Sequence, residues 1–236
     1  MIGHAVLLER AQAKLDRPIW FALTSRQADI AISAGSARAY PTDIAPFAAS
    51  DPEDETDHAG LARLTQIRAD GVHLLQANDV HVPKGLVCTL KVPSVQMVLE
   101  RQLGTPDTAE VVRLTKPDVN DMRHLVNLTR PGPFASRTLS LGPYWGIRHR
   151  GQLIAMAGER MRLSGYCEIS AVCVHPNHRR RGLARRLVSV VAAGIYARAE
   201  TPFLHTFANN ESAIALYHDM GFRLRRQMHI AALMAA

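Results

Sequence analysis

The chain has 236 residues, 47% of them hydrophobic, and a formal net charge of +7. This length suits one large domain or two small ones, and no segment approaches the length and apolarity of a transmembrane helix. Residues 1–15 contain only a three-residue apolar run, so no secretory signal is expected. Three cysteines without metal-like spacing are expected to be reduced and buried, as in a cytoplasmic protein.

The first 105 residues give mixed signals and hold no motif that carries chemistry. The four histidines there lack the spacing of metal ligands, so no metal site is predicted. The turn-forming segment 104–107 (GTPD) marks a boundary, so we expect an N-terminal α/β region at 1–105 and a second domain at 106–236. Hydrophobic patterns predict helices at 1–16, 58–70 and 95–103, strands at 20–23, 28–32, 71–76 and 85–92, and loops at 40–49 and 51–57.

Beyond residue 105 the succession of elements is clearer. Thr115 or Asp118 can cap the first helix, and Gly221 ends the last one. In order, the patterns predict a strand at 110–114, a helix at 118–128, a helical turn at 134–138, strands at 144–148, 152–162 and 166–174, a helix from 183 to about 199, a strand at 202–208, a helix at 212–220 and a strand at 223–233.

A basic turn between a predicted strand and a predicted helix is the strongest functional signal. Five arginines fall within residues 179–186. The first N–H groups of a helix have no partner inside it and carry the positive end of the helix dipole, which suits a phosphate. Gly182 has no Cβ, so the backbone can approach a ligand closely. The sequence therefore predicts an anion-binding turn, and the clustering favours a local polyanion over nucleic acid.

Three residues of this turn, Arg179, Gly182 and Ala184, fit the pattern R-x-x-G-x-G/A after V-x-P. That pattern resembles the acetyl-CoA pyrophosphate loop of the GNAT superfamily of N-acetyltransferases. A second motif, N-x-x-A-x-x-L-Y-x-x-x-G-F, runs from Asn210 to Phe222 and is also similar to that family. The stretches EISAVCVHP and NNESAIALYHDMGF resemble its subgroup related to glycine N-acyltransferase.

The resemblance covers about residues 108–234 and implies a fold. That fold is α/β (α+β): a mixed, mostly antiparallel sheet flanked by helices. Residues 1–105 would be an additional α/β region, and a degenerate second copy of the fold is left open because no internal repeat is evident.

The resemblance also implies how acetyl-CoA (coenzyme A) is held. The pantetheine arm would pair with the strand before the turn, the turn would hold the phosphates, and Asn210 would contact the pantetheine or only cap its helix. The implied cofactor-binding residues are Val172, Cys173, Val174, Arg179, Arg180, Arg181, Gly182, Leu183, Ala184, Arg185, Asn210, Ala213 and Leu216.

Two residues are implied as catalytic. Tyr217 would donate a proton to the departing thiolate, because a phenol with a pKa of about 10 is protonated at neutral pH. The alternative is that Tyr217 only packs in the core. Glu168 would accept the amine proton, directly or through water, and the alternative is a solvated glutamate at a strand end.

Side chains alternate between the two faces of a strand, and this predicts which residues share a face with Glu168. Glu168 and Val172 should share one face, with Cys173 on the other and unsuited as a nucleophile. His205 and His175 are weaker candidates for the base.

The leading hypothesis is an acetyl-CoA-dependent N-acetyltransferase that acts directly on a primary amine of a small molecule or peptide. The alternative is a non-catalytic acyl-CoA-binding sensor or interaction module, and a nucleic-acid-binding protein comes third. We expect neither a nucleic-acid nor a membrane partner, and a homodimer is left open. The acceptor amine and the preferred acyl chain have no readable code in the sequence.

Overall fold

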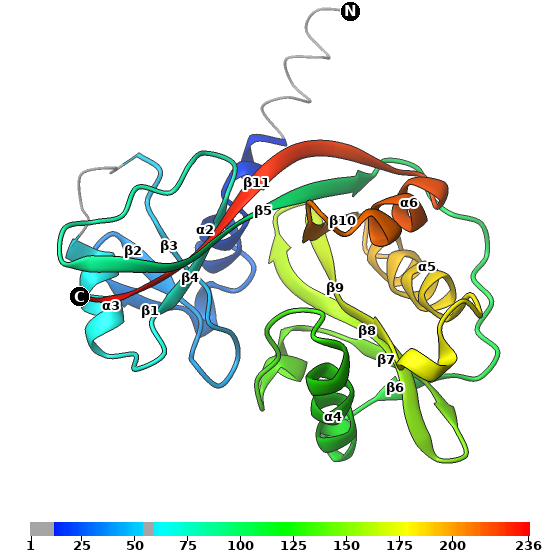
Figure 1. The fold of residues 1–236 in the computed structure, drawn as a ribbon. Coiled ribbons are helices and arrows are strands. Elements are labelled where there is room, and N and C mark those ends of the chain that lie inside the picture. Colours follow the sequence, from blue (N-terminus) through cyan, green and yellow to red (C-terminus); the bar gives the residue numbers. More distant parts are fainter. Residues whose placement is uncertain (1–11, 54–58) are drawn as a thin grey trace, which may run out of the picture.

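One eight-stranded sheet runs through the protein (Figure 1). The computed structural model describes residues 12–53 and 59–236. Within the sheet the strand order is β4-β11-β5-β10-β9-β8-β7-β6, and β9–β10 is its parallel pair. The strands are β4 (Val72–Gln76), β5 (Leu86–Leu99), β6 (Val111–Leu114), β7 (Tyr144–His149), β8 (Gln152–Leu163), β9 (Tyr166–Val174), β10 (Thr201–Phe207) and β11 (Phe222–Ala235).

Helices cover both faces of this sheet. On one face α5 packs against β7, β8, β9 and β10, and α6 packs against β11. On the other face lie α2, α4 and the small three-stranded sheet β1-β2-β3, against which α3 packs. The remaining bounds are α2 (Pro18–Leu23), α3 (Ala59–Gln66), α4 (Val119–Thr129), α5 (Leu183–Tyr196), α6 (Glu211–Asp219), β1 (Ile32–Ala34), β2 (Ala37–Ala39) and β3 (Ala48–Ser50).

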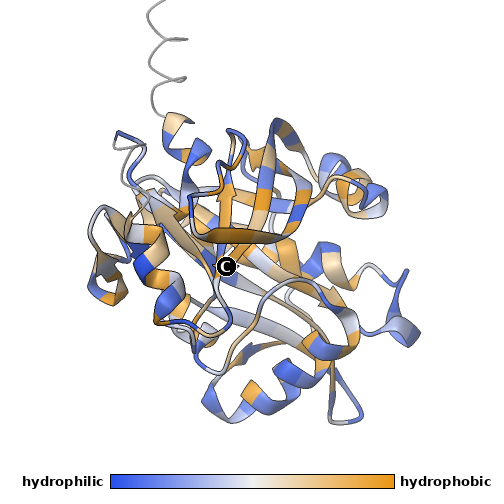
Figure 2. Cartoon of the chain, turned by 60° about the vertical axis from the view of Figure 1, so that its left-hand side comes forward, coloured by the Kyte–Doolittle hydropathy of each residue, from blue (hydrophilic) through white to orange (hydrophobic). Residues whose placement is uncertain are grey.

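The largest core lies between α5 and the sheet. Leu187, Val191 and Ile195 lie along one side of α5 and belong to one buried cluster with Ile169 and Leu204 of the strands. Figure 2 shows the corresponding mixture of hydrophilic and hydrophobic residues along the helices. Burying such a stripe contributes most of the stability of a helix in a globular protein, because short isolated helices are marginal in water.

Strands β5 and β11 connect the two ends of the molecule. Each has 14 residues, and they pair antiparallel from Phe222↔Leu99 to Ala235↔Leu86. In Figure 1 they extend from the region of α6 to the small sheet, where the C-terminus lies. The boundary expected at residues 105–106 therefore does not separate two sheets, since β5 lies between β11 and β10. As a division into domains it stays a prediction.

Three expected elements in the first half are wrong. Residues 95–103 do not form a helix: 95–99 continue β5, with Val95 and Met97 in one core and Gln96 buried on the other face. Residues 20–23 belong to helix α2, because Pro18 occupies its first turn, where a missing N–H costs nothing. The strand expected at 28–32 is a 3₁₀ turn at Ala28–Ile30, followed by β1.

Most expected elements from residue 108 onward agree with the structure within a few residues. The helical turn expected at 134–138 begins later, as a 3₁₀ turn at Thr138–Leu141. Most of the helix expected at 1–16 lies outside the described residues, and Ala13–Asp16 forms a 3₁₀ turn. None of the described helices is long and apolar enough to cross a membrane.

The cysteines are free, but only two are buried. Cys167 and Cys173 face the core, whereas Cys88 is exposed, contrary to expectation. Cys88 lies on the part of β5 whose side chains are mostly exposed, where the strand pairs with β11.

Candidate active site

A cavity of about 520 Å³ opens where two parallel strands separate. Strands β9 and β10 pair only between Tyr166–Glu168 and Thr201–Phe203. Beyond that point β9 stays paired with β8, and β10 stays paired with β5. The cavity is lined by both diverging strands, at Ile169–Val174 and His205–Phe207. Backbone groups of β9 that would face β10 in a closed sheet are thus available to a ligand.

The predicted anion-binding turn has the backbone such a site requires. Gly182 has φ +75°, a left-handed conformation that suits glycine, and a Cβ built there meets no atom within 4 Å. It is the N-cap of α5. In the described chain, the backbone N–H groups of residues 180–185 donate to no protein acceptor. Arg179 and Ala184 line the cavity.

The other residues of the turn are arranged around the cavity without lining it. Arg180, Arg181 and Arg185 are exposed, and Leu183 packs into the core below α5. Arg181 contacts His178 Nδ1 at 3.0 Å. His175 Nδ1 accepts a hydrogen bond from the Asn177 amide, so this histidine holds the turn rather than the cavity. Phosphate binding by this turn stays a prediction.

A β-bulge in β9 changes which side chains face the cavity. Met156 pairs with Cys173 but Gly158 pairs with Ser170, so β9 has an extra residue there, and Ala171 adopts φ +51°. Side chains beyond the bulge therefore switch faces.

The expected arrangement of the base strand is wrong for this reason. Val172 packs in the core of α5, with Cys167 and Ile169, so it does not share a face with Glu168. Cys173 packs with the residues of α4, on the same face as Glu168. Burial raises the pKa of the Cys173 thiol to about 11, which keeps it protonated and unreactive near neutral pH.

Helix α6 supplies the wall opposite β9. Asn210 caps this helix, since its Oδ1 accepts the Ala213 amide at 3.2 Å, and it also lines the cavity. Ala213, Leu216 and Tyr217 line it too. Burial raises the pKa of Tyr217 to about 12, so its phenol stays protonated. The structure thus places Tyr217 both in the core and at the cavity; its proton-donor role stays a prediction.

Glu168 is held in a buried ion pair. Its carboxylate is 0% exposed and accepts hydrogen bonds from Arg160 Nε at 2.7 Å and Nη2 at 2.6 Å. Burial by itself would raise the pKa of Glu168, but the charge and hydrogen bonds of Arg160, aided by His205, lower it to about 2. A carboxylate so strongly paired is a poor proton acceptor, so the geometry does not favour Glu168 as the base.

Both ring nitrogens of His205 lie within hydrogen-bond distance of a polar side chain. Its Nδ1 lies 2.7 Å from Glu168 Oε1, and its Nε2 lies 2.9 Å from Gln96 Nε2. Gln96 Oε1 accepts from Arg225 and its Nε2 donates to Leu15 O, so Nε2 is also the donor towards His205. With this arrangement His205 donates through Nδ1 to Glu168 and accepts through Nε2 from Gln96.

The far end of the cavity, which lies away from the basic turn, is lined by residues for which the sequence shows no functional signal. Phe47, His73 and Leu75 come from the first half of the chain, with Leu90 of β5 and Ile230 of β11. Their spacing carries no motif, because they meet only when β4, β11 and β5 assemble. Arg160 was also missed, and the one available signal was the mostly charged segment at 159–162 (ERMR) after the apolar first part of the strand. Among the described residues, no group of three His, Cys, Asp or Glu could hold a metal ion.

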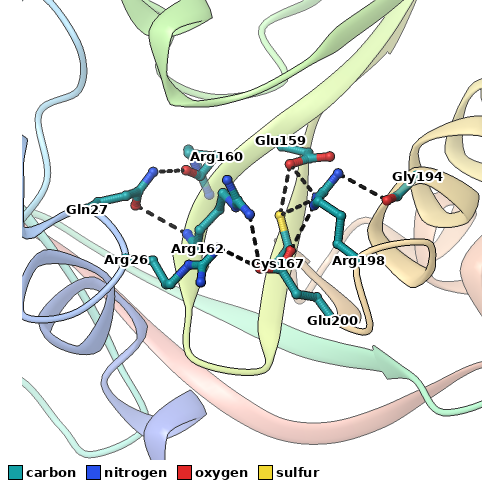
Figure 3. Close-up of polar contacts among 9 residues, drawn as sticks. All are labelled: Arg26, Gln27, Glu159, Arg160, Arg162, Cys167, Gly194, Arg198 and Glu200. Carbon is teal, nitrogen blue, oxygen red and sulfur yellow. Dashed lines mark hydrogen bonds and ion pairs between the residues drawn. The ribbon is translucent and has the colours of Figure 1, made fainter.

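A second polar network joins strands β8 and β9 to the end of α5 and to Arg26 and Gln27 of the first half of the chain (Figure 3). Arg198, just after α5, binds Glu159 at 2.8 Å and Glu200 at 3.2 Å. Cys167 donates its thiol to Glu159 at 3.2 Å, and burial raises the pKa of that thiol. Glu200 also binds Arg162, so α5, β8 and the start of β10 are joined. This cysteine is structural.

Comparisons with known proteins agree with this geometry. The FR47-like protein family model matches residues 144–230. A crystal structure from Novosphingobium aromaticivorans, of a protein assigned to the GNAT family of acetyltransferases, is 38% identical, with a TM-score of 0.86 over 94% of this chain and 98% of that one. A GCN5-related N-acetyltransferase from Kribbella flavida shares the fold at 14% identity, with a TM-score of 0.60 over 90% of this chain and 95% of that one.

A curated relative of unknown function is also similar. Protein ML0378 of Mycobacterium leprae is 29% identical over 213 residues, which cover 80% of this chain and 56% of that protein. The chain thus spans little more than half the length of this relative.

Proposed function

Because this chain belongs to the GNAT family of N-acetyltransferases, we propose that it transfers the acetyl group of acetyl-CoA directly to a primary amine of a small molecule or peptide. The observation that carries the proposal is the turn before α5: its amides at 180–185 have no hydrogen-bond partner in the described part of the chain, and it opens onto the cavity. A ligand with phosphates would satisfy those N–H groups.

The residues present fit the parts of acetyl-CoA. Its diphosphate fits the open space at Gly182, with the exposed arginines of the turn around it. The pantetheine arm fits between β9 and β10, where backbone groups of Val172, Cys173 and Val174 can pair with its amides. Acetyl-CoA supplies the activated acetyl thioester, and an amine entering from the far end of the cavity would meet it beside Tyr217.

The chemistry assigned to this chain's residues is modest. Tyr217, with its pKa raised to about 12, holds a proton that it can donate to the departing thiolate. Arg130 and Arg179 add positive charge to the wall, whereas the charge of Arg160 is matched by Glu168, and positive charge lowers the pKa of an ammonium group. The amine can therefore lose its proton to water, without a carboxylate base in the wall.

The test is a bulky side chain at Gly182. We expect Gly182→Val to raise the dissociation constant of acetyl-CoA at least about tenfold, equivalent to about 1.4 kcal/mol, because a Cβ branch there enters the ligand's space. Gly165→Val is the matched control: Gly165 also has a left-handed φ (+86°) and open space, but lies in the β8–β9 hairpin. Calorimetric titration measures the dissociation constant of acetyl-CoA for both variants. Equal affinity in the two variants would contradict the proposal.

Catalysis is tested separately from binding. The wild-type protein with acetyl-CoA and a panel of primary amines should release free thiol in proportion to N-acetylated product. Acetyl-CoA binding without thiol release from any amine would favour the alternative, a non-catalytic acyl-CoA sensor.

A further inference from the structure

Arg160 is the most unusual residue in the cavity wall. Its side chain is 11% exposed, and its guanidinium carbon lies 4.7 Å from the ring centre of Phe47. Nε and Nη2 are both engaged by Glu168. In the described part of the chain, Nη1 has no hydrogen-bond partner. A guanidinium nitrogen at a cavity wall can donate two further hydrogen bonds to a planar acceptor.

Among the described residues, the permanently charged side chains that line the cavity are all arginines. Among residues 12–53 and 59–236, no aspartate or glutamate lines the cavity, whereas Arg130, Arg160 and Arg179 do. Glu168, the nearby carboxylate, is fully buried and already binds Arg160 and His205. A substrate with several ammonium groups would find no counter-charge in this wall, and each would be poorly solvated.

The rest of the far end is apolar. Phe47, Leu75, Leu90 and Ile230 line it, with His73 beside Phe47. An apolar ligand group that covers these side chains makes the binding free energy more favourable, because it removes apolar surface from water. The far end is therefore a mainly apolar surface beside one guanidinium, that of Arg160, which keeps a nitrogen without a hydrogen-bond partner among the described residues.

We infer that Arg160 binds a substrate carboxylate through Nη1, while the apolar wall of Phe47, Leu75, Leu90 and Ile230 covers that substrate's apolar body. This inference rests on the proposed function. The carboxylate can be carried by the acceptor amine or by a dicarboxylic acyl chain on the CoA thioester. Both sources share the same chemistry at Arg160, and we expect polyamines to bind less tightly than acceptors with a carboxylate.

Equilibrium binding tests the inference without relying on turnover. In one arm, the CoA-bound protein is titrated with N-acetyl-phenylalanine and with its neutral amide. In the other arm, the free protein is titrated with succinyl-CoA and with butyryl-CoA, which has four acyl carbons but no carboxylate. We expect the acid to bind about 10- to 100-fold more tightly than its neutral match in one arm, as a charge-assisted hydrogen bond of about 1.5–3 kcal/mol provides.

Variants assign the preference to Arg160. Arg160→Lys keeps the charge but loses the planar donor group, so the preference should fall about tenfold. Because this change can disturb the pair with Glu168, a double variant with Arg160→Gln and Glu168→Gln removes both buried charges and should abolish the preference. Arg113→Lys is the matched control, since Arg113 also stacks on an aromatic ring, Trp145 at 5.2 Å, but does not line the cavity.

The outcomes separate this inference from the proposed function. Absence of acetyl-CoA binding by the folded wild-type protein would overturn the proposed function. Intact acetyl-CoA binding with no preference for the acid in either arm would overturn the role of Arg160. A preference that both Arg160 variants retain would also overturn it.

Discussion

At the scale of single residues, Glu168 and Arg160 show how the site uses a buried ion pair. Removing water from a charge is costly, and the pair offsets that cost through two hydrogen bonds of 2.6 and 2.7 Å. Neither residue could be understood from the sequence alone. Glu168 was a candidate base from its place on the strand and the family resemblance. Its partner Arg160, which lowers its pKa, lies on the neighbouring strand, and no sequence pattern links the two residues.

The first prediction concerns the pH dependence of stability. The pKa of Glu168 falls from an ordinary 4.5 to about 2 on folding, so the unfolded carboxyl binds its proton more tightly. The pair therefore stabilises the fold fully above pH 4.5, and this contribution is lost as pH falls towards 2. We expect Glu168→Gln to lower the free energy of unfolding at pH 7 by about 3–5 kcal/mol, because it leaves Arg160 buried without a counter-charge.

Urea unfolding at pH 7, 4.5 and 3 measures both effects. The Gln variant should lose less stability than the wild type between pH 4.5 and 3. Glu110→Gln is the control, because Glu110 is exposed and its contact with Arg186 is long, at 3.5 Å; the expected change is under about 1 kcal/mol. Parallel pH profiles for the wild type and Glu168→Gln would contradict the role given to this carboxylate.

At the scale of elements, periodicity and turn residues located the strands and helices of the second half well. Strand β9, the basic turn and α5 lie where the pattern placed them, within a few residues. The bulge at Ala171 could not be predicted, because left-handed positions are normally marked by glycine or asparagine and this one is an alanine. Because of this single extra residue, the side chains of Val172 and Cys173 lie on the sheet faces opposite to those expected.

The second prediction concerns this bulge. A β-branched residue is strongly disfavoured at positive φ, so Ala171→Val should shift or flatten the bulge and cost about 1–2 kcal/mol of stability. Because the bulge positions the β9 edge along the cavity, the KM for acetyl-CoA should rise about tenfold, or about 1.4 kcal/mol. Steady-state kinetics and thermal unfolding measure the two effects.

Ala199→Val is the matched control for the bulge. Ala199 also has a left-handed φ (+56°), but it is exposed in the loop after α5 and does not line the cavity. It should lose similar stability with an unchanged KM. If both variants keep the wild-type KM, the bulge does not position the cofactor.

At the scale of the whole molecule, sheet assembly was the part that local patterns could not predict. The central position of β5 depends on pairings such as Phe203↔Val98 and Phe222↔Leu99, which join residues more than 100 positions apart. No short window contains both partners. Pro93 in the middle of β5 also divided one long strand into an apparent strand and an apparent helix.

The last prediction follows from this assembly. A fragment of residues 106–236 keeps both motifs and the whole region matched by the FR47-like family model, but lacks β5. Strands β10 and β11 both pair with β5, and Val95, Met97 and Leu99 fill the core beneath α5 and α6. We therefore expect the fragment to remain unfolded and not to bind acetyl-CoA, whereas the full chain unfolds in one cooperative transition. Circular dichroism, amide proton dispersion and acetyl-CoA titration measure this; a folded fragment that binds acetyl-CoA would show that the boundary near residue 105 separates independent domains.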